Sequence, residues 1–259
     1  MDPVKKLSRS VRGLSVLVTG AASGMGRATA HAFADEGAKV AVTDFKGDGA
    51  ELVARDIREG GGTAKAWTLD VSDADAITRV VGEIANEFGG LDVLINNAGI
   101  PAGVPVDHAR YDEIWARALS VLLTAHQRTV RAALPHLRKS KSPRIVNIAS
   151  TEALGATARD TPYAAAKAGV AGLTRALAVE LGPEGITVNC ICPGPVRTGM
   201  TAPIPEEDKA VYAKRRTALR RYGDPEEVAH MTLSLCLPAA SFLTGTVIPV
   251  DGGLMARNA

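Results

Sequence analysis

Residues 19–26 read Thr-Gly-Ala-Ala-Ser-Gly-Met-Gly, and they lie between the apolar run Ser15–Thr19 and the helical pattern Arg27–Glu36. The glycines have the spacing G-x-x-x-G-x-G. Glycine adopts backbone conformations that other residues avoid, and it lets peptide N–H groups approach a phosphate at the start of a helix. Such a turn alone is weakly specific, but its place between a first strand and a first helix predicts a dinucleotide-binding loop. We expect this loop to contact the cofactor through Gly20, Ser23, Gly24, Met25 and Gly26.

The same alternation of strand and helix continues along the chain. Short apolar runs predict strands at Ser15–Thr19, Lys39–Thr43, Ala64–Leu69, Val93–Ile95, Arg144–Ala149, Thr187–Ile191 and Thr246–Val250. Helical patterns include Arg27–Glu36, Asp73–Phe88, Tyr111–Leu137, Tyr163–Leu181 and Pro225–Leu235. Nearly continuous apolar strands separated by helices predict a parallel sheet covered on both faces. No linker divides the chain, so we expect one α/β domain over residues 1–259, a Rossmann-type doubly wound sheet of about seven strands.

Composition narrows the class of protein. The 259 residues are 46% hydrophobic and 22% charged, with a formal net charge of +2, which is typical of a globular protein with a sizeable core. A charge so close to zero favours neither nucleic acid nor a membrane surface as partner. The three cysteines are too few for a disulfide framework and have no histidine at metal-ligand spacing. We expect no metal site and buried thiols in a reducing cytoplasm; the cysteines are Cys190, Cys192 and Cys236.

Two segments bear on the cellular location. Residues 1–13 lack the apolar stretch of a secretory signal. Residues 231–250 carry no charge and are about long enough to span a bilayer. Because Pro238, Gly245 and Pro249 interrupt them, they are expected to form a helix, a loop and a strand. The sequence therefore predicts a cytoplasmic protein without a membrane span.

The second strand is followed by an acidic residue that indicates which dinucleotide is used. Asp44 lies 24 residues after Gly20, where a carboxylate accepts hydrogen bonds from the adenosine ribose and repels a 2′-phosphate. NAD is therefore favoured over NADP. Asp70 and Val71 follow the third strand, where the carboxylate meets the adenine or, alternatively, caps the next helix. After the fourth strand, Asn97, Ala98 and Gly99 are expected to pack against the ribose.

A candidate catalytic group follows the fifth strand. Ser150 comes at its carboxyl end, and Tyr163 and Lys167 are spaced to share one face of the next helix. Lowering the pKa of a phenol by three units requires about 4 kcal/mol, which a neighbouring ammonium and an oxidised nicotinamide can supply. Tyr163 would then exchange a proton with a substrate hydroxyl, and Ser150 would bind the same oxygen. A lone Tyr-x-x-x-Lys is usually an ordinary helix surface; the ordered set argues against that interpretation here.

Over essentially its full length the chain resembles the classical short-chain dehydrogenase/reductase family. The matching residues are Thr19–Gly26, Asp70-Val71, Asn96–Gly99, Ser150, Tyr163, Lys167, Asn189, Pro193–Thr198 and Asp251–Gly253. The resemblance implies NAD(P)(H)-dependent oxidoreduction of an alcohol or carbonyl compound, with Tyr163 as acid/base, Ser150 orienting the substrate and Lys167 binding the nicotinamide ribose. It also implies that Pro193, Gly194, Val196 and Thr198 lie against the nicotinamide, and that the protein is a homo-oligomer, commonly a tetramer.

One position departs from the family pattern. The family places an asparagine in the long helix after the fourth strand, where it helps to hold a water in a proton relay from the lysine. Here Ala118 occupies that position. Losing one hydrogen bond of about 1–3 kcal/mol predicts a rate lower by roughly ten- to a hundredfold, since the proton-transfer pair remains. Ala118→Asn is expected to restore rate to a slowed enzyme and none to a non-catalytic protein.

The substrate end is expected to lie under residues 197–221, because ligands bind at the carboxyl ends of the strands. Six basic residues follow Glu206: Lys209, Lys214, Arg215, Arg216, Arg220 and Arg221. Such a lid would receive an anionic substrate, including an acyl thioester on a phosphorylated carrier; the alternative is a solvated helix face. Glu152 is a candidate ligand for a substrate hydroxyl, or else a surface carboxylate.

These observations predict an NAD(H)-dependent oxidoreductase that interconverts a small secondary alcohol and a ketone by hydride transfer. A second hypothesis is a 3-oxoacyl thioester reductase of the acyl-carrier-protein type, which would use NADPH. A third, from a different class, is a dinucleotide-binding protein without turnover.

Overall fold

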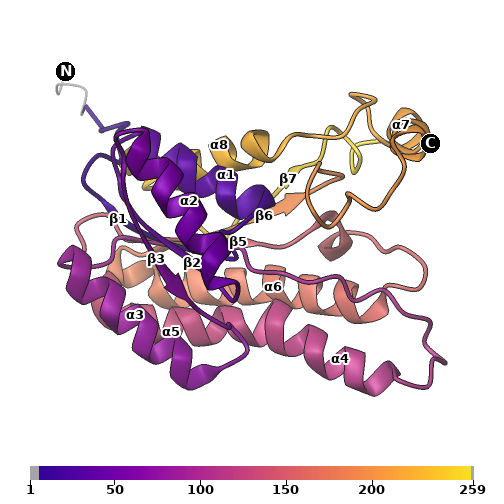
Figure 1. Ribbon diagram of the computed structural model, residues 1–259, viewed down its shortest axis with the longest axis horizontal. Helices are drawn as coiled ribbons and strands as arrows, with labels where there is room; N and C mark the ends of the chain where they lie inside the picture. The colour runs from indigo at the N-terminus through magenta and orange to yellow at the C-terminus, as the bar shows by residue number, and fades with distance from the viewer. Residues whose placement is uncertain (1–5, 258–259) are drawn as a thin grey trace.

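A computed structural model of the chain describes residues 6–257. Seven parallel strands form one sheet in the order β3-β2-β1-β4-β5-β6-β7 (Figure 1). The strands are β1 (Ser15–Thr19), β2 (Lys39–Asp44), β3 (Thr63–Thr68), β4 (Val93–Asn96), β5 (Arg144–Ile148), β6 (Thr187–Pro193) and β7 (Val247–Val250). The predicted doubly wound parallel sheet is confirmed. The expected single domain also includes residues 1–5 and 258–259, which lie outside the described residues.

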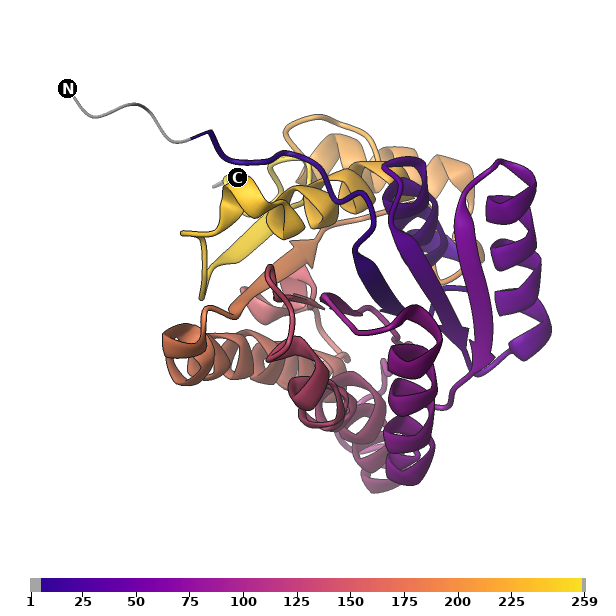
Figure 2. The same cartoon turned by 90° about the vertical axis from the view of Figure 1, so that its left-hand side faces the viewer.

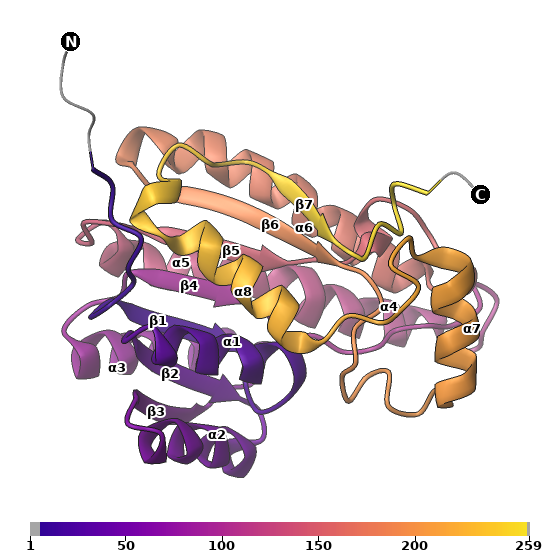
Figure 3. The ribbon, with the colours of Figure 1, turned by 90° about the horizontal axis from the view of Figure 1, so that it is seen from above.

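Helices cover both faces of the sheet (Figure 2). One face carries α1 (Gly24–Asp35), α2 (Gly47–Glu59) and α8 (Pro225–Cys236). The other carries α3 (Ala74–Phe88), α5 (Ala125–Leu137) and α6 (Thr161–Leu181), with α4 (Tyr111–Leu119) beside α6. Helix α7 (Glu206–Arg216) lies apart from both layers, beyond the carboxyl ends of the strands (Figure 3). Short helical turns are η2 (Thr151–Ala153), η3 (Gly182–Glu184) and η4 (Pro238–Ala240).

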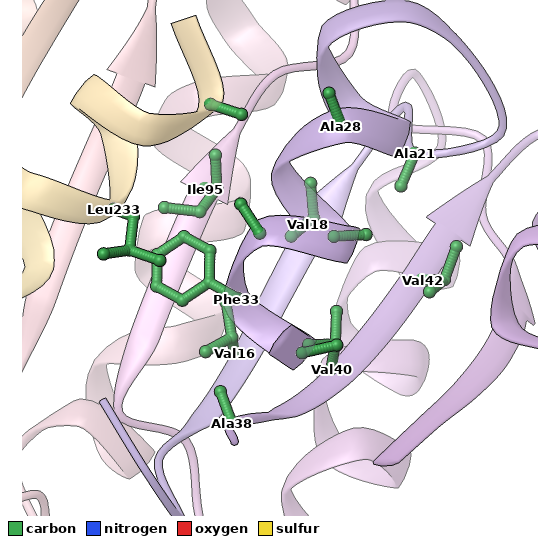
Figure 4. Packing of buried hydrophobic residues seen from close by; sticks show 14 of the residues in the cluster. Val16, Val18, Ala21, Ala28, Phe33, Ala38, Val40, Val42, Ile95 and Leu233 are labelled. Atoms are coloured by element: carbon green, nitrogen blue, oxygen red, sulfur yellow. The ribbon is translucent and has the colours of Figure 1, made fainter. Parts of the chain in front are cut away.

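The first layer shows how the apolar runs become a core. Phe33 of α1 is fully buried between Val16 of β1 and Leu233 of α8 (Figure 4). Burying a side chain of this kind contributes about 1.5–3 kcal/mol. Because the strands are apolar on both faces, the same strands support the second core against α3, α5 and α6.

The sheet order places the ligand edge. Strand β1 pairs with β2 on one side and with β4 on the other. The strand order therefore runs in opposite directions from the neighbouring strands β1 and β4. In such sheets a crevice opens beyond the carboxyl ends of the strands where the direction changes. The residues that follow β1, β2, β4 and β5 are therefore brought together.

Three elements differ from the expectation. Helix α2 was not among the expected helices, because its glycines, such as Gly47 and Gly49, obscure the helical pattern. The single long helix expected over Tyr111–Leu137 is interrupted by a π-helical turn, η1 (Ser120–Thr124). Strand β3 ends at Thr68, so Asp70 lies in the loop beyond it. Within residues 6–257, no helix is both long enough and apolar enough to cross a membrane.

Candidate active site

The loop after β1 is built for close approach. Gly20 has φ +64°, and a Cβ atom there would lie 2.6 Å from Cα of Ala98. A Cβ at Gly26 would collide with the carbonyl oxygen of Gly20. Ser23 is the exposed N-cap of α1 but makes no side-chain capping bond, and Met25 is partly buried behind it. The first N–H groups of α1 therefore remain available to an anion such as a pyrophosphate.

The loop after β4 is tied to this turn. The backbone N–H groups of Asn97 and Ala98 donate to Oγ1 of Thr19 at 3.0 and 3.1 Å. The Asn97 amide donates to the carbonyl oxygens of Thr19 and Gly20 at 2.9 and 3.1 Å. Gly99 follows at the exposed end of the loop. Asn97 thus acts first as a structural clamp on the glycine-rich turn.

Asp44 is buried at the end of β2 and faces the same turn. Its Oδ2 accepts the N–H of Ala22 at 3.1 Å, and its Oδ1 accepts the N–H of Lys46 at 3.0 Å. A carboxylate has about four acceptor positions, so two remain for a diol. The residues at this edge fit a dinucleotide: an uncapped helix N-terminus, a cradle of glycines and a fixed carboxylate.

The remaining expected cofactor contacts divide into two groups. Val71 is buried, whereas Asp70 is exposed and accepts the N–H and hydroxyl of Ser72 at 2.8 and 2.7 Å. Asp73 is the residue that caps α3, so the capping alternative for Asp70 is wrong. The second group is the segment after β6: a Cβ at Gly24 would lie 3.3 Å from the Thr198 side chain.

This segment after β6 is also fixed at its other end. Pro193 and Val196 are buried, and Val196 bridges to Gly223. A Cβ at Gly194 would lie 2.7 Å from Cα of Asp251. Packing on both sides therefore holds residues 193–198 beside the glycine-rich turn.

Ser150, Tyr163 and Lys167 converge beyond the end of β5. Lys167 is buried, and its Nζ donates to the carbonyl oxygen of Ile148 at 2.8 Å. The same Nζ lies 5.6 Å from the centroid of the Tyr163 ring. The Ser150 hydroxyl accepts the N–H of Glu152 at 3.1 Å, which holds it at the start of η2.

The electrostatics of Tyr163 differ from the expectation. Burial raises its pKa to about 12, and a hydrogen bond from Ser150 opposes this rise only in part. Burial also lowers the pKa of Lys167 to about 8. In the free protein Lys167 therefore does not make Tyr163 acidic, because the ammonium is directed at Ile148 and the phenol is desolvated. The expected lowering of the Tyr163 pKa included the charge of an oxidised nicotinamide, and it stays a prediction for the complex with the cofactor.

Ala118 lies in an apolar pocket. It is fully buried and packs in a cluster with Leu122, Ala166 and Tyr163. The π-helical turn η1 begins two residues later, and such turns are frequent at functional sites. An asparagine at this position would place an amide among apolar side chains. Ala118→Asn is therefore expected to strain the core before it can restore a relay.

Glu152 and Asp160 are two carboxylates near Tyr163 and near each other. Both carboxylate oxygens of Glu152 bind Thr157, one its N–H and the other its hydroxyl, each at 2.7 Å. Glu152 is therefore engaged in shaping the loop 152–157. Asp160, which the sequence reasoning passed over, raises the pKa of Tyr163 together with Glu152. An acidic residue before a helix is normally understood as a cap, so the sequence offered no signal for another role.

The lid is less basic at its surface than its composition indicates. Lys209 is buried and pairs with Glu206 at 2.7 Å. Arg221 pairs with Glu227 at 2.6 Å. Exposed side chains on or near α7 remain at Lys214, Arg215, Arg216 and Arg220. Two of the six basic residues are therefore used in ion pairs within the protein, which weakens the argument for an anionic substrate.

The C-terminal residues close onto the lid. The N–H of Leu219 donates to the carbonyl oxygen of Gly252 at 3.0 Å. Asp251 accepts the N–H groups of Gly253 and Met255 at 2.9 and 2.8 Å. A Cβ at Gly155 would lie 3.6 Å from Cε of Met255. The tail therefore joins the lid to the loop that follows Ser150.

A cavity of about 590 Å³ opens elsewhere, between α1, α8 and the first part of the lid. Its walls include Gly24 and Thr198 but none of the three candidate catalytic residues. It therefore borders the glycine-rich turn but not the candidate catalytic residues. Among the described residues, no group of three or more His, Cys, Asp and Glu side chains is arranged to hold a metal ion.

Comparisons with known proteins agree with this arrangement. A family model described as enoyl-(acyl carrier protein) reductase matches residues 20–255. Meso-2,3-butanediol dehydrogenase of Serratia marcescens is 40% identical over 243 residues, which are 94% of this chain and 95% of that protein. A 3-oxoacyl-(acyl-carrier-protein) reductase of Thermotoga maritima is 36% identical over 95% of this chain and 99% of its own length.

A solved structure of similar shape holds a cofactor. It is that of a candidate NAD(P)-dependent gluconate 5-dehydrogenase of Beutenbergia cavernae, with NADP bound at low occupancy. The two structures share a TM-score of 0.90 and 37% sequence identity, over 96% of this chain and 100% of the other.

Fold, site and comparisons together define an NAD(P)-dependent oxidoreductase that acts on CH–OH groups. The chain belongs to the short-chain dehydrogenase/reductase family, so the resemblance is confirmed. The hypothesis of a dinucleotide-binding protein without turnover is set aside with this assignment.

Proposed function

We propose that this protein is an NAD(H)-dependent dehydrogenase that interconverts a secondary alcohol and a ketone. The proposal rests on the convergence of Ser150, Tyr163 and Lys167. They lie at the carboxyl-terminal edge of the sheet, the edge at which strand β2 ends in Asp44. A nicotinamide dinucleotide supplies the hydride acceptor or donor when it is bound. The protein's own groups must then orient the substrate oxygen and move one proton.

Each residue has a role in that proton transfer. In alcohol oxidation the substrate hydroxyl gives its proton to the Tyr163 oxygen, and in ketone reduction the proton moves back. Ser150 donates a hydrogen bond to the developing alkoxide or to the carbonyl oxygen. Lys167 binds the nicotinamide ribose and keeps a positive charge near the phenol. The positive charge of the oxidised cofactor adds to that of Lys167 in opposing the raised pKa of Tyr163.

The preference for NAD rests on Asp44. Its carboxylate is held by two backbone N–H groups, so it cannot turn away from the ribose without losing both bonds. A 2′-phosphate at this place would meet that negative charge. We therefore assign the remaining cofactor contacts for NAD to residues 20–26, 70–71, 97–99 and 193–198.

A 3-oxoacyl thioester reductase using NADPH is the second candidate. The relative from Thermotoga maritima favours it, as do the exposed cations Lys214, Arg215, Arg216 and Arg220. The internal pairing of Lys209 and Arg221 and the position of Asp44 speak against it.

The test is nicotinamide absorbance during incubation with a panel of secondary alcohols and ketones and with acetoacetyl-CoA. NAD(H) and NADP(H) are supplied in parallel. We expect turnover of alcohols or ketones with NAD(H). Turnover of acetoacetyl-CoA alone, and with NADPH alone, would instead establish the thioester reductase.

The assembly and location are part of the same proposal. A homotetramer in the cytoplasm is supported by the family membership and by three buried, unpaired cysteines. Two large apolar side chains are strongly exposed, Val179 of α6 at 81% and Phe242 before β7 fully, which favours a partner over these positions. Of the small residues in α6, Ala166 is buried within the chain and Gly169 packs on Leu123, whereas Ala165, Ala168 and Ala176 are exposed and free for a partner. Light scattering coupled to size exclusion measures the assembly directly.

A further inference from the structure

Asp160 has the position of a helix cap but not its contacts. It is the N-cap residue of α6, yet its carboxylate makes no capping hydrogen bond. The side chain is partly buried, and within residues 6–257 it has no ion-pair partner. A capping hydrogen bond ordinarily stabilises a protein by about 1 kcal/mol. A carboxylate at the N-cap that does not form it must therefore be kept from it by other structural constraints.

The backbone beside Asp160 supplies such constraints. Arg159 has φ +66°, a conformation that is uncommon for a residue with a side chain. Its carbonyl oxygen accepts the N–H of Val104 at 2.6 Å. This bond joins the loop before α6 to the loop after β4. A Cβ at Gly103 would lie 3.5 Å from Oδ1 of Asp160, so this carboxylate oxygen lies beside the loop after β4.

Asp160 and the candidate catalytic tyrosine lie within one turn of α6. Asp160 is the N-cap and Tyr163 is the third helical residue, a pair whose side chains share one side of the helix start. The negative charge of Asp160 is close enough to raise the pKa of Tyr163. Glu152 also acts on Tyr163, but both of its oxygens are used by Thr157. Asp160 therefore has the free acceptor oxygens at this end of the site.

Burial raises the pKa of Asp160 to about 6, and the nearby charge of Glu152 adds to this rise, so Asp160 is mostly ionised at neutral pH. Leu154 and Met255 are exposed at 42% and 38%, and Met255 contacts the loop at Gly155. A substrate whose reacting oxygen meets Tyr163 then has the carboxylate of Asp160 nearby. That carboxylate accepts a hydrogen bond from a donor group and repels an anion.

We propose that Asp160 recognises the substrate by accepting a hydrogen bond from a second hydroxyl group near the reacting carbon. Preferred substrates are then neutral diols and hydroxy ketones rather than carboxylates or other anions. The inference rests on the proposed function, because it takes Tyr163 as the place where the reacting oxygen binds.

The test compares two probes that differ by one hydroxyl group, 2,3-butanediol and 2-butanol. In Asp160→Ala we expect KM for 2,3-butanediol to rise about ten- to a hundredfold with kcat within about threefold, because a charged hydrogen bond is lost in ground and transition states alike. For 2-butanol, kcat/KM should stay within about threefold. Asp160→Asn is expected to improve oxidation of 3-hydroxybutyrate, since it removes the charge and keeps the shape.

Asp75→Asn is the matched control, because Asp75 lies in the first turn of α3 and has no part in the site. It should leave both probes unchanged. Thermal melting should show that Asp160→Ala remains folded, since no capping bond is lost. An equal change for 2,3-butanediol and 2-butanol in Asp160→Ala would overturn the inference while the proposed function stands. Absence of turnover of every alcohol and ketone by the unaltered protein, with either cofactor, would overturn both.

Discussion

Tyr163 is partly buried, and we expect the desolvation of its hydroxyl group to set the pH dependence of the reaction. At neutral pH the free protein holds almost all Tyr163 as the phenol, because burial raises its pKa to about 12. Alcohol oxidation needs the deprotonated form and ketone reduction the protonated form. We expect kcat/KM for oxidation to rise with pH, by up to about tenfold per unit between pH 6 and 9, and kcat/KM for reduction to fall at alkaline pH. An oxidation rate that is flat over this range would show that another group is the base.

At the same scale, we propose that Asp44 determines which dinucleotide is preferred. Asp44→Asn removes the negative charge that faces a 2′-phosphate but keeps the size of the side chain. We expect the ratio of kcat/KM for NAD to that for NADP to fall at least about tenfold, that is, by about 1.4 kcal/mol. The amide nitrogen cannot accept the second backbone N–H, so a modest loss of thermal stability should accompany the change. An unchanged ratio would remove the basis for preferring NAD.

At the scale of elements, we propose that the turn between β1 and α1 binds the cofactor. A Cβ at Gly26 collides with the Gly20 carbonyl and approaches the Asn97 amide, which ties this turn to the loop after β4. Gly26→Ala should therefore weaken NADH binding at least about a hundredfold and destabilise the protein by about 1–3 kcal/mol. Fluorescence titration with NADH and thermal melting measure the two effects.

Gly82→Ala is the matched control for this substitution. Gly82 lies inside α3, and a Cβ there meets nothing within 4 Å. Alanine should stabilise the helix by about 0.5–1 kcal/mol and leave NADH binding unchanged. Equal NADH affinities in the two alanine variants would mean that the turn does not hold the cofactor.

The elements also show what sequence could and could not predict. The strands follow from apolar runs, and the convergence of Ser150 with Tyr163 and Lys167 follows from strand order and helical spacing, which are local or topological properties. Which carboxylate, Glu152 or Asp160, stays free to bind a substrate depends on the hydrogen bonds that each makes. Glu152 is engaged by Thr157, and this contact exists only in the folded chain. The burial of Lys209 has the same origin, because only packing of α7 shows that its charge is used internally. Spacing carries no such information.

At the scale of the whole molecule, the two cores share one sheet, and we propose that residues 1–259 unfold as one unit. The two tryptophans report on different places. Trp67 on β3 contacts Phe88 at 5.9 Å between ring centroids, and Trp115 on α4 lies 6.1 Å from Tyr111. The single-tryptophan variants Trp67→Phe and Trp115→Phe should give coincident denaturant midpoints, equal to that seen by circular dichroism. Two separate midpoints would indicate two domains.

The central claim is that one phenol moves the proton while the rest of the fold holds the dinucleotide. The most direct measurement compares the protein with Tyr163→Phe, following nicotinamide absorbance with 2,3-butanediol and NAD and, separately, NADH binding by fluorescence. We predict that the variant binds NADH with unchanged affinity and loses turnover by at least about a hundredfold. Turnover at the rate of the unaltered protein would contradict the account.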